Sequence, residues 1–177
     1  MPRDPLANPK ALVLRVYAYV AYRIGDGPDA QDVTSETFAR ALRYRSTFDP
    51  RKGDPVAWLL GIARRCIHDA QTVGAGEVAL TYEIAASGEL ESESVERIDL
   101  QRAVLALEPR ARELVALRYG ADLTARQIAD LLGERTNTIE VALHRAIAQL
   151  RVLLAEPEDE ANRARTRERS RPKPTTS

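Results

Sequence analysis

Residues 123–150 read LTARQIADLLGERTNTIEVALHRAIAQL. Apolar residues recur there at helical spacing in two runs, over residues 124–132 and from residue 137 to about residue 154. Residues 133–136 separate the runs, and their glycine suits a tight turn. Two short helices in immediate succession are typical of a helix-turn-helix. The pattern also fits two packed helices of an ordinary bundle.

A helix-turn-helix can place the start of its second helix in the major groove of DNA, where side chains meet phosphates and base edges. The apolar residues of both helices are expected to face inward. The candidates for contact with DNA are Arg135, Thr136, Asn137, Thr138 and Arg145.

The sequence before this motif also has helical spacing. One helix is predicted from Pro9 to Ile24, where Gly25-Asp26-Gly27 ends it, and a second begins at Pro28. Residues 43–55 contain prolines and a glycine that demand a loop. A third helix should begin at Pro55 and fade by residue 74.

Between residues 72 and 96 there are six glutamates, no basic residue and only scattered apolar positions, so we expect a flexible acidic linker. Helical spacing resumes at Val95 and covers residues 97–154, with a break at Pro109. Residues 155–177 alternate acid and base and are expected to be disordered. The predicted fold is all-α, with two small helical domains at residues 1–71 and 97–154.

Composition excludes several classes of protein. The single cysteine, Cys66, rules out an internal disulfide and is expected to be a core residue, and two histidines give no ligand set for zinc. No glycine-rich phosphate loop or nucleophile beside a base is present, so we expect no enzyme, cofactor or small-molecule substrate. The absence of a long apolar run or a leader-like start predicts no membrane insertion and a cytoplasmic location.

Two blocks of sequence resemble a known family. Residues 29–41, Phe48-Asp49-Pro50 and residues 57–64 are similar to region 2 of bacterial sigma-70 family factors of the extracytoplasmic-function type. Leu107-Glu108-Pro109-Arg110 and several motifs within residues 123–146 are similar to region 4 of the same family. The resemblance covers roughly residues 10–71 and 97–153, in the family's order. It implies a subunit that binds core RNA polymerase and directs promoter-specific initiation through the minus-ten and minus-35 elements.

The resemblance also implies roles for particular residues. The helix around residues 32–40 resembles the surface that docks on the clamp helices of the polymerase β′ subunit, and its candidates are Asp32, Glu36, Phe38 and Arg40. Phe38 fits a core position equally well. The loop at residues 45–54 and the helix at 55–68 resemble the part that recognises and melts the minus-ten element, with Arg51, Lys52, Arg64 and Arg65 as candidates. Trp58 is expected to pack in the core.

Region 4 of the family binds the minus-35 element and the polymerase β flap. The acidic linker is a mimic of nucleic acid in this scheme, or a solvated spacer. An anti-sigma factor is a possible partner.

Many relatives carry basic and small polar residues where this chain has Glu140-Val141-Ala142, so Glu140 either caps the helix with Asn137 or the minus-35 contacts lie elsewhere. The alternative function is a helix-turn-helix regulator that acts without polymerase.

Overall fold

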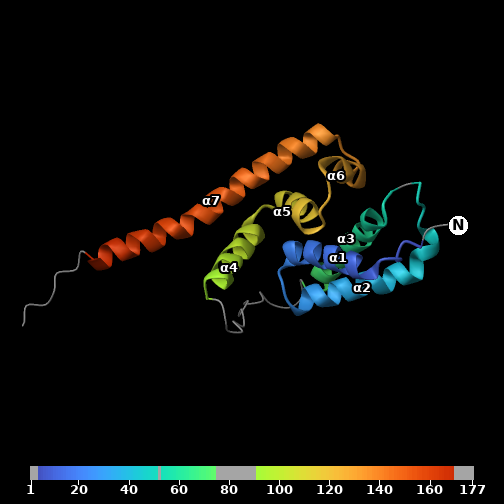
Figure 1. Ribbon diagram of the computed structural model, residues 1–177, viewed down its shortest axis with the longest axis horizontal. Helices are drawn as coiled ribbons and strands as arrows, with labels where there is room; N and C mark the ends of the chain where they lie inside the picture. Colours follow the sequence, from blue (N-terminus) through green and yellow to red (C-terminus); the bar gives the residue numbers. More distant parts are fainter. Residues whose placement is uncertain (1–3, 52, 75–90, 170–177) are drawn as a thin grey trace, which may run out of the picture.

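The computed structural model describes residues 4–51, 53–74 and 91–169 (Figure 1), and these residues form helices and no strand. The all-α prediction is therefore confirmed for the described part of the chain. The elements are α1 Pro9–Ile24, α2 Pro28–Tyr44, the 3₁₀ turn η1 Arg45–Thr47, α3 Pro55–Gly74, α4 Glu91–Ala106, α5 Pro109–Val115, the π-helical η2 Ala116–Gly120, α6 Ala125–Leu132 and α7 Thr136–Arg169.

The first three helices begin where the sequence predicts. Pro9, Pro28 and Pro55 each occupy the start of a helix, where the missing N–H has no intrahelical partner and the fixed φ suits the helix. The Oδ1 atom of Asp54 accepts a hydrogen bond from the backbone N of Val56 at 2.9 Å, which satisfies one free donor of α3. Gly25 ends α1 with a φ of 99°, in the region that favours glycine.

The helix-turn-helix has the local geometry that its sequence predicts. The Thr124 side chain accepts a hydrogen bond from the backbone N of Gln127 at 3.2 Å, and the Gln127 side chain accepts one from the backbone N of Thr124 at 2.9 Å. This reciprocal pair is a capping box at the start of α6. Gly133 ends α6 in the left-handed conformation, with a φ of 69°, and makes the turn into α7.

Two helices run further than the expected boundaries. Helix α4 begins at Glu91, within the predicted linker and before Val95, while residues 75–90 of that linker lie outside the described residues. Helix α7 continues to Arg169, past Ala155, where the disordered tail was expected to begin, and Figure 1 shows it projecting beyond the other helices. Residues 158–169 are rich in Ala, Glu and Arg, which are strong helix formers and favour this extension, although α7 also passes through Pro157, where proline is unfavourable.

Apolar residues from both predicted domains share the main core of the structure. A single cluster of buried residues contains Val16 and Tyr19 of α1, Leu59 of α3, Leu117 of η2 and Ile128 of α6. A smaller cluster joins α4, α5 and α7 through Val104, Leu107, Val115 and Ala146. The two halves of the chain therefore share their interior in this arrangement, instead of meeting only through a linker.

Gly120 marks the closest approach between the two halves. A Cβ atom at this position would lie 2.9 Å from the carbonyl oxygen of Ala18 and 3.0 Å from the Cα atom of Tyr19. Only glycine lets the backbone of η2 pass this close to α1. Arg15 of α1 then donates from Nε to the carbonyl oxygen of Ala121 at 2.8 Å, which ties the end of η2 to the same helix.

Several single-residue predictions are decided by burial. Cys66 is a free thiol and 3% exposed, so its core assignment is confirmed. Trp58 is half-buried and packs against the core, and its ring meets that of Phe48 edge-on, with 5.6 Å between the ring centroids.

Among the described helices, none is long and apolar enough to cross a bilayer.

Candidate nucleic-acid interface

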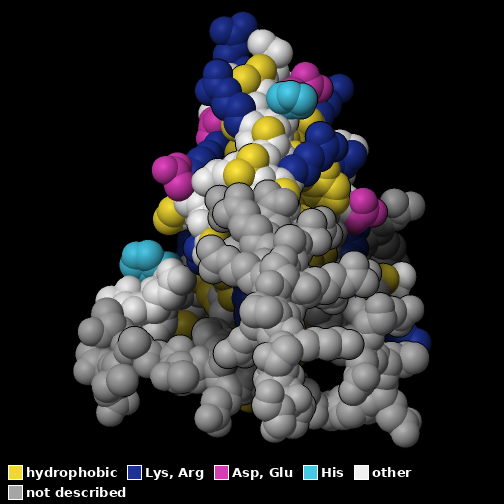
Figure 2. All heavy atoms as spheres, turned by 90° about the vertical axis from the view of Figure 1, so that its left-hand side faces the viewer, with side chains coloured by type: hydrophobic (Ala, Val, Ile, Leu, Met, Phe, Trp, Pro, Cys, Tyr) yellow, Lys and Arg dark blue, Asp and Glu magenta, His cyan; other side chains and the backbone are white. Residues whose placement is uncertain are grey.

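Four of the five residues predicted to contact a minus-35 element are exposed in the turn before α7 or in its first three turns. Arg135, Asn137, Thr138 and Arg145 are exposed and Thr136 is half-buried, while Ile139 and Ala146 are turned into the core at 0% and 2% exposure. Figure 2 shows Lys and Arg side chains gathered toward the top of the molecule, the end where α6 and the start of α7 lie in Figure 1. The structure therefore brings the predicted minus-35 residues together on one solvent-facing surface.

Glu140 has no part in capping this helix. Helix α7 begins at Thr136, so Asn137 lies inside its first turn, and no hydrogen bond joins Asn137 to Glu140 in the described part of the chain. Within the described residues a capping box is formed at Thr124, at the start of α6, and not at Asn137. Glu140 is exposed, beside the residues predicted to meet DNA.

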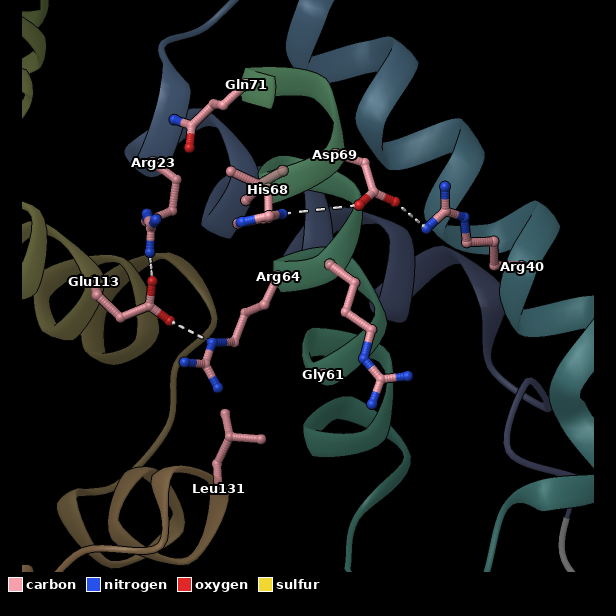
Figure 3. Close-up of a pocket in the computed structure, with 11 residues that line it drawn as sticks. Arg23, Arg40, Gly61, Arg64, His68, Asp69, Gln71, Glu113 and Leu131 are labelled. Carbon is pink, nitrogen blue, oxygen red and sulfur yellow. Dashed lines mark hydrogen bonds and ion pairs between the residues drawn. The ribbon is translucent and has the colours of Figure 1, made fainter. Parts of the chain in front are cut away.

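The residues predicted to contact the minus-ten element are divided by the structure. Arg64 and Arg65 are exposed on α3 and line a cleft of about 600 Å³, together with Arg23 of α1 and Arg40 of α2 (Figure 3). Arg51 lies in the loop before α3 and does not line this cleft. Lys52 lies outside the described residues.

Glu113 of α5 occupies the side of this cleft that belongs to the second half of the chain. Its Oε1 atom lies 3.1 Å from Nε of Arg64 and accepts a hydrogen bond from the Tyr19 hydroxyl at 3.0 Å. Its Oε2 atom pairs with Arg23. Figure 3 shows the carboxylate between the two arginines. We call Tyr19, Arg23, Arg64 and Glu113 the interdomain cluster.

Burial governs the electrostatics of the interdomain cluster. Glu113 is 5% exposed and Tyr19 is fully buried. Burial raises the pKa of Tyr19 to about 12, although Arg23 and Arg64 act in the opposite direction. Burial also lowers the pKa of Arg23, because the charged guanidinium loses water. The Glu113 carboxylate supplies the opposite charge that the partly buried Arg23 needs and accepts the hydrogen bond of the neutral Tyr19 phenol.

Glu113 was not predicted from the sequence, although the residues that follow it could have indicated its burial. Glu113 precedes Leu114, Val115, Ala116 and Leu117, and all of these are buried. A carboxylate next to a wholly buried run is a candidate for burial with charged partners. The partners Arg23 and Arg64 lie far away in the sequence, so their identity needed the tertiary structure.

The surface of α2 predicted to bind polymerase is organised by ion pairs. Arg40 pairs with Glu36 at 2.7 Å and with Asp69 of α3, also at 2.7 Å. The hydrogen bond from Arg40 holds the pKa of Asp69 below its ordinary value. Asp32 is exposed, whereas Phe38 is half-buried and packs against the core. Phe38 is thus separated from the charged surface that Asp32, Glu36 and Arg40 share.

Comparison with known proteins identifies both halves of the chain. The family model for sigma-70 region 2 matches residues 10–72, and the model for sigma-70 region 4 matches residues 97–150. The extracytoplasmic-function (ECF) RNA polymerase sigma factor BldN of Streptomyces coelicolor is 36% identical over 152 residues, which cover 81% of this chain and 57% of that protein. The chain thus spans little more than half of BldN. The ECF sigma factor SigK of Mycobacterium ulcerans is 29% identical, over 77% of this chain and 78% of its own length.

Two solved structures share the fold. The sigma factor RpoE, crystallised with the anti-sigma factor NepR from Bartonella quintana, has a TM-score of 0.63 and 20% identity, covering 81% of this chain and 92% of its own. CnrH in complex with the cytosolic domain of CnrY has a TM-score of 0.59 and 21% identity, covering 87% of this chain and 94% of its own. The two family matches in their expected order, together with the relatives named as extracytoplasmic-function sigma factors, show that the chain belongs to the sigma-70 family of RNA polymerase sigma factors, in its extracytoplasmic-function group.

Proposed function

We propose that this chain binds core RNA polymerase in the bacterial cytoplasm and directs it to promoters, with no chemistry of its own. In this proposal α2 docks on the β′ clamp helices, α3 with its preceding loop reads and melts the minus-ten element, and α4–α7 bind the β flap and the minus-35 element. The observation that carries the proposal is the presence of both sigma regions in one chain, in the family's order.

The described arrangement supports a resting form of the protein and not the promoter-bound form. The minus-ten and minus-35 elements lie about 25 base pairs apart, which is about 85 Å at a rise of about 3.4 Å per pair. Here α3 contacts α6, which is about 12 Å long and leads directly into α7. Two helices this close together cannot reach both elements at once.

Promoter binding therefore requires the two halves to separate. Separation breaks the contacts of Glu113 with Tyr19, Arg23 and Arg64, and it exposes the apolar residues of the shared core. It also frees Arg64, a predicted minus-ten residue, to follow the DNA backbone. Contacts with polymerase must offset these losses.

An anti-sigma factor is the proposed regulator. Of the two similar structures, one is a complex with the anti-sigma factor NepR, and the other holds the cytosolic domain of CnrY. A partner that stabilises the packed arrangement of the two halves keeps the chain from the promoter by mass action.

Run-off transcription with reconstituted core polymerase and a library of promoters tests the proposal. The chain is expected to bind core and to start transcripts from a subset of promoters. Asp32→Lys reverses an exposed charge on the proposed clamp-binding surface and is expected to weaken core binding. Lys10→Glu reverses an exposed charge on α1, which has no part in the proposed contacts, so it is the matched control and should leave core affinity unchanged. Failure of the unaltered chain to bind core at micromolar concentration would overturn the proposal.

A gel shift separates this function from that of a regulator that acts without polymerase. The exposed face of α7 is compatible with both. A sigma factor in the packed arrangement is expected to shift promoter DNA only when core is added. A tight, sequence-specific shift by the chain alone would favour the independent regulator.

A further inference from the structure

The exposed face of α7 carries two residues that no DNA backbone contact explains. At about 100° per residue, Val141 lies about 200° around the helix from the buried Ile139, so it points away from the core. It is 44% exposed. Glu140 lies about 100° from Ile139 and flanks Val141 on one side, while Arg145, at about 240°, flanks it on the other.

Glu140 cannot favourably meet the phosphates. A carboxylate near the DNA backbone is repelled, whereas arginines and lysines displace counterions and gain affinity. Glu140 also forms no ion pair or hydrogen bond within the described residues that would hold it away from the groove. Its position in the second turn is the part of a recognition helix whose side chains contact base edges.

Base edges in the major groove offer one group that a carboxylate matches and one that valine matches. The N4 amino group of cytosine is a donor, and Glu or Asp accepts from it. The C5 methyl group of thymine is the apolar feature of the groove, and small apolar side chains contact it.

We propose that Glu140 and Val141 are specificity-determining residues of α7. Glu140 accepts a hydrogen bond from the N4 amino group of a cytosine in the minus-35 element, and Val141 packs against the C5 methyl group of a neighbouring thymine. This assignment rests on the proposed sigma function. Many relatives carry basic and small polar residues where this chain has Glu140-Val141-Ala142. Under this assignment, that difference in sequence changes which minus-35 elements the chain prefers.

The test uses holoenzyme assembled from core polymerase and the full chain, with promoters randomised across the minus-35 element and constant elsewhere. The unaltered chain is expected to enrich cytosine at one position and thymine beside it. Glu140→Gln should lower the cytosine enrichment about tenfold at that one position and move the preference toward adenine, because an amide matches adenine N6 and N7. Val141→Ala should lower the thymine enrichment by a smaller factor.

Asp130→Asn is the matched control, because it removes the same charge from an exposed position on α6. It should raise binding to all sequences alike and leave every base preference unchanged. A Glu140→Gln profile that matches the Asp130→Asn profile at all positions would overturn the assignment of Glu140. Thermal unfolding of each variant shows whether the fold is retained. No transcript from any promoter with the unaltered chain would overturn the proposed function, and this inference with it.

Discussion

The two surfaces proposed to meet promoter DNA differ in what their charged side chains contact. On α3, Arg64 is held by Glu113 from the other half of the chain, at 3.1 Å. By contrast, Arg135 just before α7 and Glu140 and Arg145 within it are exposed and form no ion pair within the described residues. The proposed minus-35 residues thus have no charged partner within the described residues, whereas Arg64 of the proposed minus-ten residues is paired with an internal carboxylate. Under the proposed function, separation of the halves is therefore expected to free Arg64 for the minus-ten element.

The largest expected effect comes from removing the carboxylate that joins the halves. Glu113→Ala leaves Arg23 and Arg64 without their shared partner, in a site where Glu113 is almost fully buried. The free energy of unfolding should fall by about 3 kcal/mol, as for other broken buried pairs. Urea denaturation measures the change.

Glu134→Ala is the control for this prediction. Glu134 pairs with Arg110 at the surface, where their side chains are 33% and 46% exposed, so its removal should cost at most about 1 kcal/mol. Equal losses for the two variants would remove the distinction between a buried and a surface carboxylate on which the comparison depends.

A smaller loss is expected from adding one methyl group between the halves. Gly120→Ala puts a Cβ atom 2.9 Å from the backbone oxygen of Ala18 and should cost about 1–3 kcal/mol, because two backbones must move apart. In Gly61→Ala, the new Cβ atom of α3 meets no atom within 4 Å, so this variant should be neutral or stabilised by up to about 1 kcal/mol. Thermal unfolding compares the two. A Gly120→Ala protein as stable as the original would show that the halves do not pack this closely.

The buried tyrosine of the interdomain cluster predicts a loss of stability in alkali. The pKa of Tyr19 is raised from 10.0 to about 12 in the folded chain. Below pH 10 the phenol is neutral in both states, and its contribution is fully present. Between pH 10 and about 12 the unfolded chain ionises first, so the free energy of unfolding falls, by on the order of 2 kcal/mol in total.

Tyr19→Phe should remove this part of the alkaline loss. The difference in unfolding free energy between the original chain and the variant is expected to shrink from pH 10 to 12. Tyr44→Phe, at a tyrosine that is 54% exposed, serves as the comparison and should keep the original profile. If both variants behave alike, the phenol of Tyr19 is not held neutral by the packed halves.

The smallest effect is expected within the helix-turn-helix. Thr124→Ala removes the capping box of α6 and should lower the unfolding free energy by about 1 kcal/mol. Thr138→Ala, on the exposed face of α7, should change it by less than about 0.5 kcal/mol. Amide hydrogen exchange should locate the loss of protection in α6 for Thr124→Ala. Identical exchange in both variants would contradict the capping role.

Much of the fold follows from local features of the sequence. Pro9, Pro28 and Pro55 begin helices because proline is free of cost only in a first turn, and Gly133 permits the left-handed turn between α6 and α7. The ends of α4 and α7 were less predictable. The acidic stretch before Val95 and the alternating charges after Ala155 predict a linker and a tail. The same stretches contain strong helix formers, and α4 and α7 extend into them.

The sequence predicted the candidate surface on α7 better than the one on α3, because local patterns do not reveal contacts between distant helices. The residues from Arg135 to Thr138 follow from the turn, because helical spacing alone determines which side of α7 faces outward. For α3, the sequence offered Arg64 and Arg65 as minus-ten candidates, and both are exposed. It did not reveal that Arg64 has a partner, because the partner is a carboxylate on α5.

The sequence by itself therefore determined the all-helical class, the start of most helices and the outward face of α7, since each depends on neighbours within a few positions along the chain. It also identified the family, through two blocks of sequence in the family's order. Only the tertiary structure decided that the two halves share one core, that Gly120 lies against Ala18 and that Glu113 lies between Arg23 and Arg64. Those contacts join residues far apart in the sequence, and their stability comes from burying apolar surface and pairing buried charge, which no local pattern encodes.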